Sequence, residues 1–510
     1  MARPPWWHRG VVYQIYPRSF ADGNGDGIGD LRGLLDRVEY LAWLGIDAVW
    51  LSPIYPSPMA DFGYDVAEYC DVDPLFGTLA DLDTVRDALH DRGIKLLLDW
   101  IPNHTSDRHP WFLDSRSSRS SPRRDWYVWR DPRPGGGPPN NWVHAFSDGR
   151  PAWTFDAPTG QYYLHSFLPA QPDLDWSAPA VEQAMHAVLR FWLDRGIDGF
   201  RIDVVHGLGK DPELPDDPPE RAGLPHIAFN DHPSVHPILR RLRALVDAYP
   251  GDRVLVGEVF LLGPHDVTAY YGQGDELHLA FDLPRCLHVP WEATSWREHT
   301  AAVLAAHEAR QAWPTLVLSN HDTPRHRSRL GSEARARAAA FLLLGLPGTP
   351  FLYAGEELGL EDAVIPPERA VDPGGRDGCR APLPWDATPS HGWNASPWLP
   401  WPPEPARRNV VELRADEASI LHLYRRLLRA RRGSPALAWG TWRPLRTNAA
   451  VFAWERGADG DRRLVAVNFT DDEARLELEG RVEVSSDGSG EGQPFAGVLA
   501  PCAGVILRPD

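Results

Sequence analysis

One pattern that occurs three times in the first 200 residues constrains the fold of this chain most strongly. An amphipathic stretch ends in glycine, isoleucine follows, and a short apolar run begins, at Gly45-Ile46, Gly93-Ile94 and Gly196-Ile197. Glycine commonly ends a helix, and a continuous apolar run is typical of a strand that is buried on both faces. The pattern therefore predicts repeating helix and strand units around a parallel sheet.

Further apolar runs have the length of buried strands. Besides the runs that follow Gly93 and Gly196, they comprise residues 11–16, 48–51, 254–256, 279–283, 315–318 and 351–353. Eight parallel strands that alternate with helices form a (β/α)8 TIM barrel. We therefore predict an α/β protein with this barrel at its centre.

The spacing of the pattern predicts the domain organisation. The second interval, from Gly93 to Gly196, is much longer than the first and is rich in Pro, Gly, Ser and Arg. We expect a loop-rich domain B to be inserted there after strand 3, at residues 104–176, between a first part of the barrel at 1–103 and a second part at 177–434. From residue 435 onward, short alternating strands with Gly and Asp turns predict an antiparallel β-sandwich domain at 435–510.

Composition excludes several classes of partner. The 52 Lys and Arg against 70 Asp and Glu give a net charge of −18, which disfavours nucleic acid as a partner. The four cysteines lack the spacing of a metal site, and no apolar run is long enough to span a membrane. We expect a cytoplasmic protein that binds a small molecule, without nucleic acid or membrane, as a monomer or small homo-oligomer.

Acidic residues end four of the predicted strands, at Asp99, Asp203, Glu258 and Asp322. One such acid alone is typical of a turn or a helix cap. In a parallel barrel, however, catalytic groups stand at the carboxyl ends of the strands, and clustered carboxylates repel one another unless arginine or function holds them. Four acids on one rim therefore indicate an active site.

Retaining glycoside hydrolysis requires two carboxyl groups close together, one ionised and one protonated. Arg201 lies two residues before Asp203, on the same side of the strand, and favours the ionised form of that carboxylate. Glu258 follows an apolar run and is better placed to stay protonated. The residues alone thus favour Asp203 as nucleophile and Glu258 as general acid.

These motifs resemble the α-amylase superfamily of glycoside hydrolases, in particular its α-glucosidase and oligo-1,6-glucosidase branch. The resemblance covers nearly the whole chain and rests on the segments at residues 12–20, 61–65, 99–104, 199–203, 257–258 and 320–322. It implies a retaining, exo-acting α-glucosidase that releases α-glucose from the non-reducing end of short α-glucosides such as maltose and isomaltose. It also implies Asp203 as nucleophile, Glu258 as acid/base and Asp322 as the third carboxylate.

The resemblance implies further substrate contacts. His104, Arg201 and His321 would surround the first sugar or the nucleophile. Tyr64 would be the stacking platform, and Asp61 with Arg380 would hold the outer hydroxyls and close the pocket. Phe167 would line the next subsite.

A Gly- and Asp-rich segment suggests a metal site. Its oxygen-bearing residues alternate as in a calcium loop, at Asp22, Asn24, Asp26, Ile28 and Asp30. The segment is not an EF-hand, because Gly33 occupies the position of the final glutamate. A simple turn is the alternative, but the family branch implies a structural calcium or magnesium ion here, and no organic cofactor.

Two other functions remain open. A glucosyl-transferring or isomerising relative, of the trehalose synthase or isomaltulose synthase type, would share every catalytic residue and differ in how well water is excluded. A non-enzymatic relative is disfavoured because all three acids are present.

Val204, directly after the nucleophile, resembles members that act on α-1,6 links and favours tolerance of those links.

Overall fold

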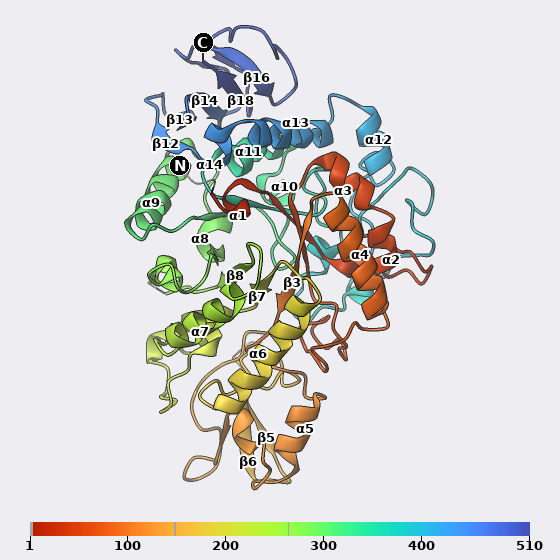
Figure 1. The fold of residues 1–510 in the computed structure, drawn as a ribbon, viewed down its shortest axis with the longest axis vertical. Coiled ribbons are helices and arrows are strands. Elements are labelled where there is room, and N and C mark those ends of the chain that lie inside the picture. The colour runs from red at the N-terminus through yellow and green to blue at the C-terminus, as the bar shows by residue number, and fades with distance from the viewer. Residues whose placement is uncertain (1–3, 147–148, 264, 510) are drawn as a thin grey trace.

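The computed structural model describes residues 4–146, 149–263 and 265–509. Three parts follow one another down the molecule in Figure 1: the C-terminal domain at one end, a barrel in the middle, and an inserted segment with α5, β5 and β6 at the other end. The predicted barrel is confirmed. Its parallel strands are ordered β10-β11-β1-β2-β3-β7-β8-β9.

Each barrel strand lies where the apolar pattern predicts it, within a few residues at the ends. The strands are β1 (Val12–Ile15), β2 (Ala48–Leu51), β3 (Lys95–Trp100), β7 (Gly199–Ile202), β8 (Val254–Val259), β9 (Leu279–Asp282), β10 (Thr315–Val317) and β11 (Thr349–Tyr353). The register pairs Val12 with Ala48 and with Phe351. Between β9 and β10 the Thr315 hydroxyl donates to the carbonyl of Ala280 at 3.0 Å, which nearly closes the barrel.

Helices surround the strands and separate them along the chain. They are α1 (Trp6–Arg9), α2 (Leu31–Leu35), α3 (Val38–Leu44), α4 (Leu79–Asp91), α6 (Pro179–Asp194), α7 (Val235–Asp247), α8 (Leu283–Leu287), α9 (Ala293–Ala309), α10 (His326–Leu330) and α11 (Glu333–Gly345). Gly45 ends α3 with φ +95°, a conformation that glycine adopts without strain. Thr78 and Asp81 form a capping box that starts α4.

The segment between β3 and β7 contains α5 (Pro110–Ser117) and a small antiparallel sheet in the order β4-β6-β5. These strands are β4 (Trp129–Arg130), β5 (Trp153–Asp156) and β6 (Gln161–Leu164). The aromatic runs of the sequence pack here, with the rings of Phe112 and Trp129 stacked at 5.8 Å. These two rings continue the main core, whereas Trp142, Trp153 and Leu164 belong to a small separate cluster of buried side chains.

After β11 come α12 (Val410–Ala415), α13 (Ile420–Gly433) and α14 (Pro435–Trp439). The C-terminal domain then forms a five-stranded antiparallel sheet, β12-β13-β14-β18-β16, and a separate two-stranded sheet of β15 and β17. The strands are β12 (Thr441–Pro444), β13 (Val451–Ala458), β14 (Asp461–Asn468), β15 (Ala474–Arg475), β16 (Arg481–Ser485), β17 (Val498–Leu499) and β18 (Gly504–Arg508).

Two buried arginines connect this end of the chain to the barrel. Arg431 on α13 donates to the carbonyls of Leu344 and Gly348 at 3.0 and 2.6 Å. Arg456 on β13 donates to the carbonyl of Gly345 at 2.8 Å. Both arginines thus bind the short turn that leads from α11 into β11.

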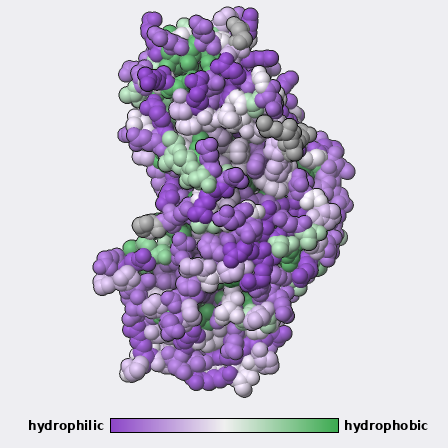
Figure 2. All heavy atoms as spheres, turned by 60° about the vertical axis from the view of Figure 1, so that its left-hand side comes forward, coloured by the Kyte–Doolittle hydropathy of each residue, from purple (hydrophilic) through white to green (hydrophobic). Residues whose placement is uncertain are grey.

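The surface is mostly polar on the face drawn in Figure 2, where hydrophilic residues predominate. Among the described residues, no helix combines the length and hydrophobicity needed to cross a lipid bilayer.

Candidate active site

The four acids that end predicted strands meet at one rim of the barrel. Asp203, Glu258 and Asp322 line a cavity of about 360 Å³, and Asp99 is buried directly behind it. The cavity is also lined by several residues predicted from the sequence, namely Asp61, Tyr64, His104 and Phe167. A volume of this size is typical of small-molecule sites.

Arg201 lies at the centre of the acidic cluster and is 2% exposed. Its Nη1 donates to Asp99 Oδ1 and to Asp203 Oδ1, each at 2.8 Å. Its Nη2 donates to Glu258 Oε2 at 2.5 Å. The sequence suggested that Arg201 distinguishes Asp203 from Glu258, but one guanidinium instead binds both carboxylates and a third. The distinction between them must therefore come from their other contacts.

The remaining contacts are indeed different. Glu258 Oε2 also accepts the backbone N–H of Val204 at 3.0 Å, so this oxygen already has two donors. Val204 has φ +34°, which is a strained conformation for a β-branched residue and aims its N–H at Glu258. The second carboxyl oxygens, Glu258 Oε1 and Asp203 Oδ2, are not taken by these donors and remain for substrate or a proton.

Burial and mutual repulsion control protonation in this cluster. Burial raises the pKa of Asp203, and the neighbouring acids Glu258, Asp99 and Asp322 raise it further, although Arg201 opposes them. Burial also raises the pKa of Glu258, with a contribution from Asp322. Burial and repulsion thus disfavour two charged carboxylates side by side and favour one proton shared by the pair, which is the arrangement that a nucleophile with a protonated acid requires.

Behind the carboxylates, Asp99 is held by tyrosine and arginine. Burial raises the pKa of Asp99 to about 6, while Arg201 and Tyr64 stabilise its ionised form. The Tyr64 hydroxyl donates to Asp99 Oδ2 at 2.9 Å. Sequence analysis counted Asp99 among the rim acids, and the structure gives it a supporting position rather than a place on the cavity wall.

His321 packs flat against Tyr64, with ring centres 5.4 Å apart. The Tyr64 hydroxyl uses its proton to donate to Asp99, so the Tyr64 oxygen accepts from His321 Nε2 at 2.5 Å. On the other side of the ring, Gln14 Nε2 donates to His321 Nδ1 at 2.7 Å. This pattern assigns the ring proton to Nε2. Burial lowers the pKa of His321 to about 3, so the ring is neutral at physiological pH.

Asp322 is the most accessible of the three cavity acids, with a side chain that is 28% exposed. Its Oδ1 accepts from Arg376 Nη1 at 3.0 Å and from Arg380 Nη2 at 3.1 Å. Although burial favours protonation, His321 and these two arginines hold the pKa of Asp322 well below its usual range. Asp322 is therefore ionised throughout the physiological range.

The arginine beside Asp61 is Arg376, which corrects the prediction of Arg380. Arg376 Nη2 donates to Asp61 Oδ1 at 2.6 Å, and Arg376 lines the cavity. Arg380 is fully buried and instead donates through Nε to the carbonyl of His321 at 2.8 Å. Both arginines bind Asp372, so Arg380 supports the site from behind while Arg376 faces it.

The side of the cavity near the inserted segment is formed by His104 and Phe167, and the buried Gln171 lies behind them. Gln171 Nε2 donates to Asp61 Oδ2 at 3.0 Å and lies 3.1 Å from His104 Nε2. The rings of His104 and Phe167 are 5.1 Å apart. Phe146, which the sequence did not single out, lies under the Arg376 guanidinium at 4.8 Å.

Sequence reasoning thus missed Arg376, Phe146 and Gln171. Arg376 stands four residues before Arg380 in one Gly-rich loop, so spacing alone does not identify which of the two faces the cavity. Gln171 lies in a motif that is visible in the sequence, at residues 171–175. Phe146 lies in an irregular loop and carries no local signal.

The predicted metal loop supplies hard oxygen atoms at the start of α2. Asp22 accepts the backbone N–H of Gly25 and Gly27, and Asp30 caps α2 by accepting the N–H of Gly33 at 2.7 Å. Within the described ranges, no three His, Cys, Asp or Glu side chains gather in the geometry of a metal site. Bound calcium would therefore also need the Asn24 side chain and the Ile28 carbonyl, and both are donors that calcium accepts.

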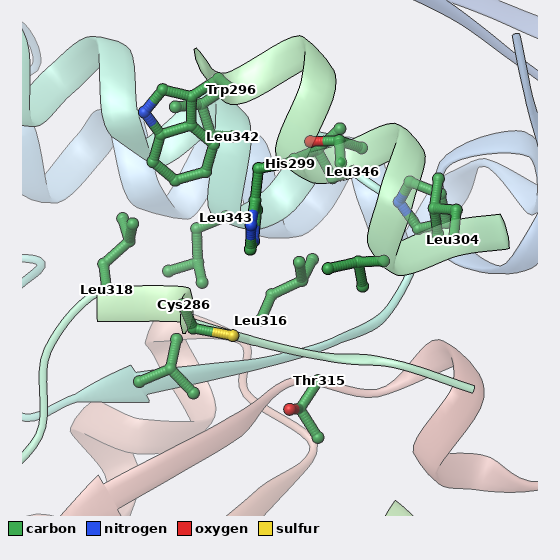
Figure 3. Close-up of a pocket in the computed structure, with 14 residues that line it drawn as sticks. Cys286, Trp296, His299, Leu304, Thr315, Leu316, Leu318, Leu342, Leu343 and Leu346 are labelled. Atoms are coloured by element: carbon green, nitrogen blue, oxygen red, sulfur yellow. The ribbon is translucent and has the colours of Figure 1, made fainter. Parts of the chain in front are cut away.

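A small apolar cavity of about 40 Å³ lies elsewhere, between α8, α9, α11 and β10. Figure 3 shows Cys286, Trp296 and His299 among leucines at this place. The cavity has room for about one water molecule and none of the clustered acids lines it. It is a packing feature of the barrel wall rather than part of the acidic site.

Comparisons with known proteins match most of the chain. The α-amylase catalytic domain matches residues 14–440. A probable alpha-glucosidase from Rhizobium meliloti is 41% identical, over 93% of this chain and 91% of that protein. The oligo-1,6-glucosidase of Parageobacillus thermoglucosidasius is 37% identical over 91% of both chains.

Solved structures match equally well. The alpha-glucosyl transfer enzyme XgtA superposes with a TM-score of 0.91 at 38% identity and covers the whole of both chains. The trehalulose synthase MutB from Pseudomonas mesoacidophila MX-45 superposes with a TM-score of 0.92 at 34% identity, over 99% of this chain and all of that one.

Proposed function

The chain belongs to the α-amylase family of glycoside hydrolases, and from this premise we propose that it is a retaining, exo-acting α-glucosidase. Its substrates are short α-glucosides such as maltose, isomaltose or related oligosaccharides, from which it releases α-glucose at the non-reducing end. The relatives named alpha-glucosidase and oligo-1,6-glucosidase support this substrate class.

The reaction takes place in two displacements. Asp203 attacks the anomeric carbon while Glu258 gives its proton to the glycosidic oxygen, so that the bond to the leaving alcohol breaks and a glucosyl ester of Asp203 forms. Glu258 then takes a proton from water, whose oxygen attacks the same carbon and frees Asp203. Glu258 Oε1 is the oxygen for this proton, because Arg201 and the Val204 N–H already bind Oε2.

Asp322 remains ionised through both steps and stabilises the positive charge that develops on the sugar. Its two arginine partners keep it in place. The ring of Tyr64 lines the cavity and faces the same sugar, and the neutral, buried His321 supports the Tyr64 hydroxyl from behind. Arg201 would move little during the reaction, because it is bound to three carboxylates at once.

Exo-action is explained by the ion pair of Asp61 and Arg376, which closes one end of the cavity. Their ion pair stands across this end, and the rings of Phe146 and Phe167 pack beside it. A carboxylate and a guanidinium suit the outer hydroxyls of a terminal glucose. A longer chain would have to displace this pair to extend past it.

The observation that carries the proposal is the arrangement of Asp203 and Glu258 on one guanidinium, beside a cavity that Asp61 and Arg376 close. The test is a product time course on maltose, isomaltose, sucrose and trehalose. We expect glucose as the dominant product from maltose or isomaltose, and loss of turnover in Asp203→Asn. Full activity of Asp203→Asn would refute the assignment of the nucleophile.

A second candidate is transfer of the glucosyl group to a sugar instead of water. The structural similarity to XgtA and to trehalulose synthase favours this alternative, since both superpose over essentially the whole chain. The same time course distinguishes the two functions: a new disaccharide at constant total sugar would identify an isomerase or transferase.

We also propose that the loop from Asp22 to Asp30 holds a structural calcium or magnesium ion. The oxygens of Asp22, Asn24, Asp26 and Asp30 and the Ile28 carbonyl are the donors that would bind it. The ion would stabilise the loop before α2, on which Trp398 also packs through a hydrogen bond to the Gly27 carbonyl.

A further inference from the structure

Two glutamates stand side by side directly after β11, and both are buried. Glu357 accepts the hydroxyls of Tyr13 and Tyr40, each at 2.7 Å, and the backbone N–H of Gly355 at 3.0 Å. Its partners therefore belong to β1, α3 and its own turn. Glu356 is equally buried, but among the described residues no hydrogen-bond donor lies in good geometry at either of its carboxyl oxygens.

The ion pair of Glu356 is with His326, the first residue of α10. His326 Nδ1 lies 3.3 Å from Glu356 Oε1, and both side chains are almost wholly buried. A buried carboxylate is costly to separate from its partner, because the charge is then left without compensation. The position of His326 is therefore tied to that of Glu356.

His326 also closes the loop that carries Asp322. Its backbone N–H donates to Ser319 Oγ at 2.8 Å, and the same oxygen lies 3.0 Å from its ring Nδ1. Ser319 and His326 thus join the two ends of the loop that follows β10. Inside this loop, Asn320 Oδ1 accepts the backbone N–H of Asp322 at 3.0 Å. A short series of fixed contacts therefore connects the backbone of Asp322 to Glu356.

A second contact joins the same two segments. Arg325 Nη1 donates to the carbonyl of Ala354 at 2.9 Å. The carboxylate of Asp322 is held by Arg376 and Arg380, which also follow β11 in the chain. The segment after β11 thus fixes both the backbone of the Asp322 loop and the carboxylate that this loop carries.

We propose that His326 and Glu356 are positioning residues of the reaction, which hold Asp322 where its charge stabilises the transition state. The inference rests on the α-glucosidase function proposed above, in which Asp322 faces the positive charge of the sugar. A displacement of such a group is costly in rate, because it acts only from its preorganised position. Neither His326 nor Glu356 is among the residues that line the cavity, so both act through the loop.

The neighbouring glutamates give a matched pair of variants. Glu356→Gln removes the carboxylate that pairs with His326, whereas Glu357→Gln makes the same change where the partners are Tyr13 and Tyr40. We expect Glu356→Gln to lower kcat for the preferred disaccharide by about 10-fold to 100-fold. Glu357→Gln should keep the kcat of the wild type, even if its Tm is lower.

Variants of His326 test the same pair from the other side. His326→Leu should reproduce the loss of kcat, and the double variant Glu356→Gln/His326→Leu should be no slower than the slower single variant, because the two residues act as one unit. His326→Asn places an amide nitrogen near the position of Nδ1 and keeps a donor for Glu356. It should therefore recover much of the kcat that His326→Leu loses.

A cationic glucose mimic reports the position of the Asp322 charge. We expect the Ki of 1-deoxynojirimycin, which has a positively charged ring, to rise in Glu356→Gln by a larger factor than the Ki of glucose, which is neutral. A general loss of structure would instead weaken both ligands by the same factor and would lower the Tm.

Several results would overturn the inference and leave the α-glucosidase function intact. They are equal kcat values in Glu356→Gln and Glu357→Gln, or equal factors for the two inhibitors. If Glu356→Gln does not fold, the His326 variants decide, because a wild-type kcat in His326→Leu, or no recovery in His326→Asn, also overturns it. Absence of glucose from every substrate of the wild type refutes the proposed function itself.

Discussion

Replacement of Arg376 by methionine should separate its role from that of Arg380. Methionine keeps much of the length of the side chain but removes the charge and all five donors. In the variant, Asp61 retains only the Gln171 amide among its observed donors, and Asp322 retains Arg380. Asp372 keeps its contact with Arg380.

The magnitude follows from the two contacts that face substrate, to Asp61 at 2.6 Å and to Asp322 at 3.0 Å. A hydrogen bond to a charged group contributes about 1.5–3 kcal/mol. Loss of both gives about 3–6 kcal/mol, or a decrease in kcat/KM of about 10²-fold to 10⁴-fold. Arg376→Lys keeps one charge without the planar fork and should fall between the wild type and Arg376→Met.

The assay is glucose release from maltose or isomaltose, whichever the wild type prefers, together with the Tm of each variant. Arg380→Met is the comparison: Arg380 is fully buried and donates to Asp322, so its loss should lower the Tm as well as kcat/KM, whereas loss of Arg376 should lower kcat/KM with little change in Tm. If Arg376→Met folds with a wild-type Tm and retains kcat/KM within fivefold, the assignment of Arg376 to the closed end of the cavity is wrong.

Three further predictions concern stability. Burial lowers the pKa of His109 to about 3. Below the ordinary histidine pKa of about 6.5, His109 is therefore protonated in the unfolded chain but stays neutral in the native protein, so the free energy of unfolding falls as pH decreases. His109→Asn keeps an N-cap acceptor without this titration; its Tm relative to the wild type should rise from pH 7 to pH 5, and a constant difference would contradict the argument. If the loop at Asp26 binds calcium, a chelator lowers the Tm of the wild type and added calcium restores it, whereas Asp26→Ala responds to neither; a wild type that is insensitive to the chelator argues against the metal. Arg431→Met should reduce the free energy of unfolding in urea by about 3–5 kcal/mol with unchanged kcat/KM, because it leaves buried carbonyls without donors; an unchanged urea midpoint would refute this.

The barrel could be predicted because its local signals agree with its tertiary structure. The Gly-Ile pattern at Gly45, Gly93 and Gly196 reflects a left-handed glycine followed by a buried strand, and each such glycine has positive φ in the structure. The strand ends also fix the catalytic acids, because parallel topology brings Asp203, Glu258 and Asp322 to one rim.

Residues in irregular loops could not be predicted in the same way. The choice between Arg376 and Arg380 depends on how a long Gly-rich loop folds back over the barrel, and no periodicity encodes that path. The sharing of Arg201 among Asp99, Asp203 and Glu258 depends on side-chain rotamers of three strands. A sequence shows that these charges are near one another, but not which atoms they bond.

The two buried arginines that bind the turn before β11 have a consequence for the order in which the chain matures. The turn at residues 344–348 is synthesised well before Arg431 and Arg456, yet its carbonyls are bonded by both. When the last barrel strand of the nascent chain has been synthesised, the carbonyls of this turn are therefore still bound to water. We expect a chain that ends after the Arg376 loop but before α13 to hold β11 and that loop loosely. The C-terminal domain would then stabilise the active site in the last step of folding, although it contributes no residue to the cavity.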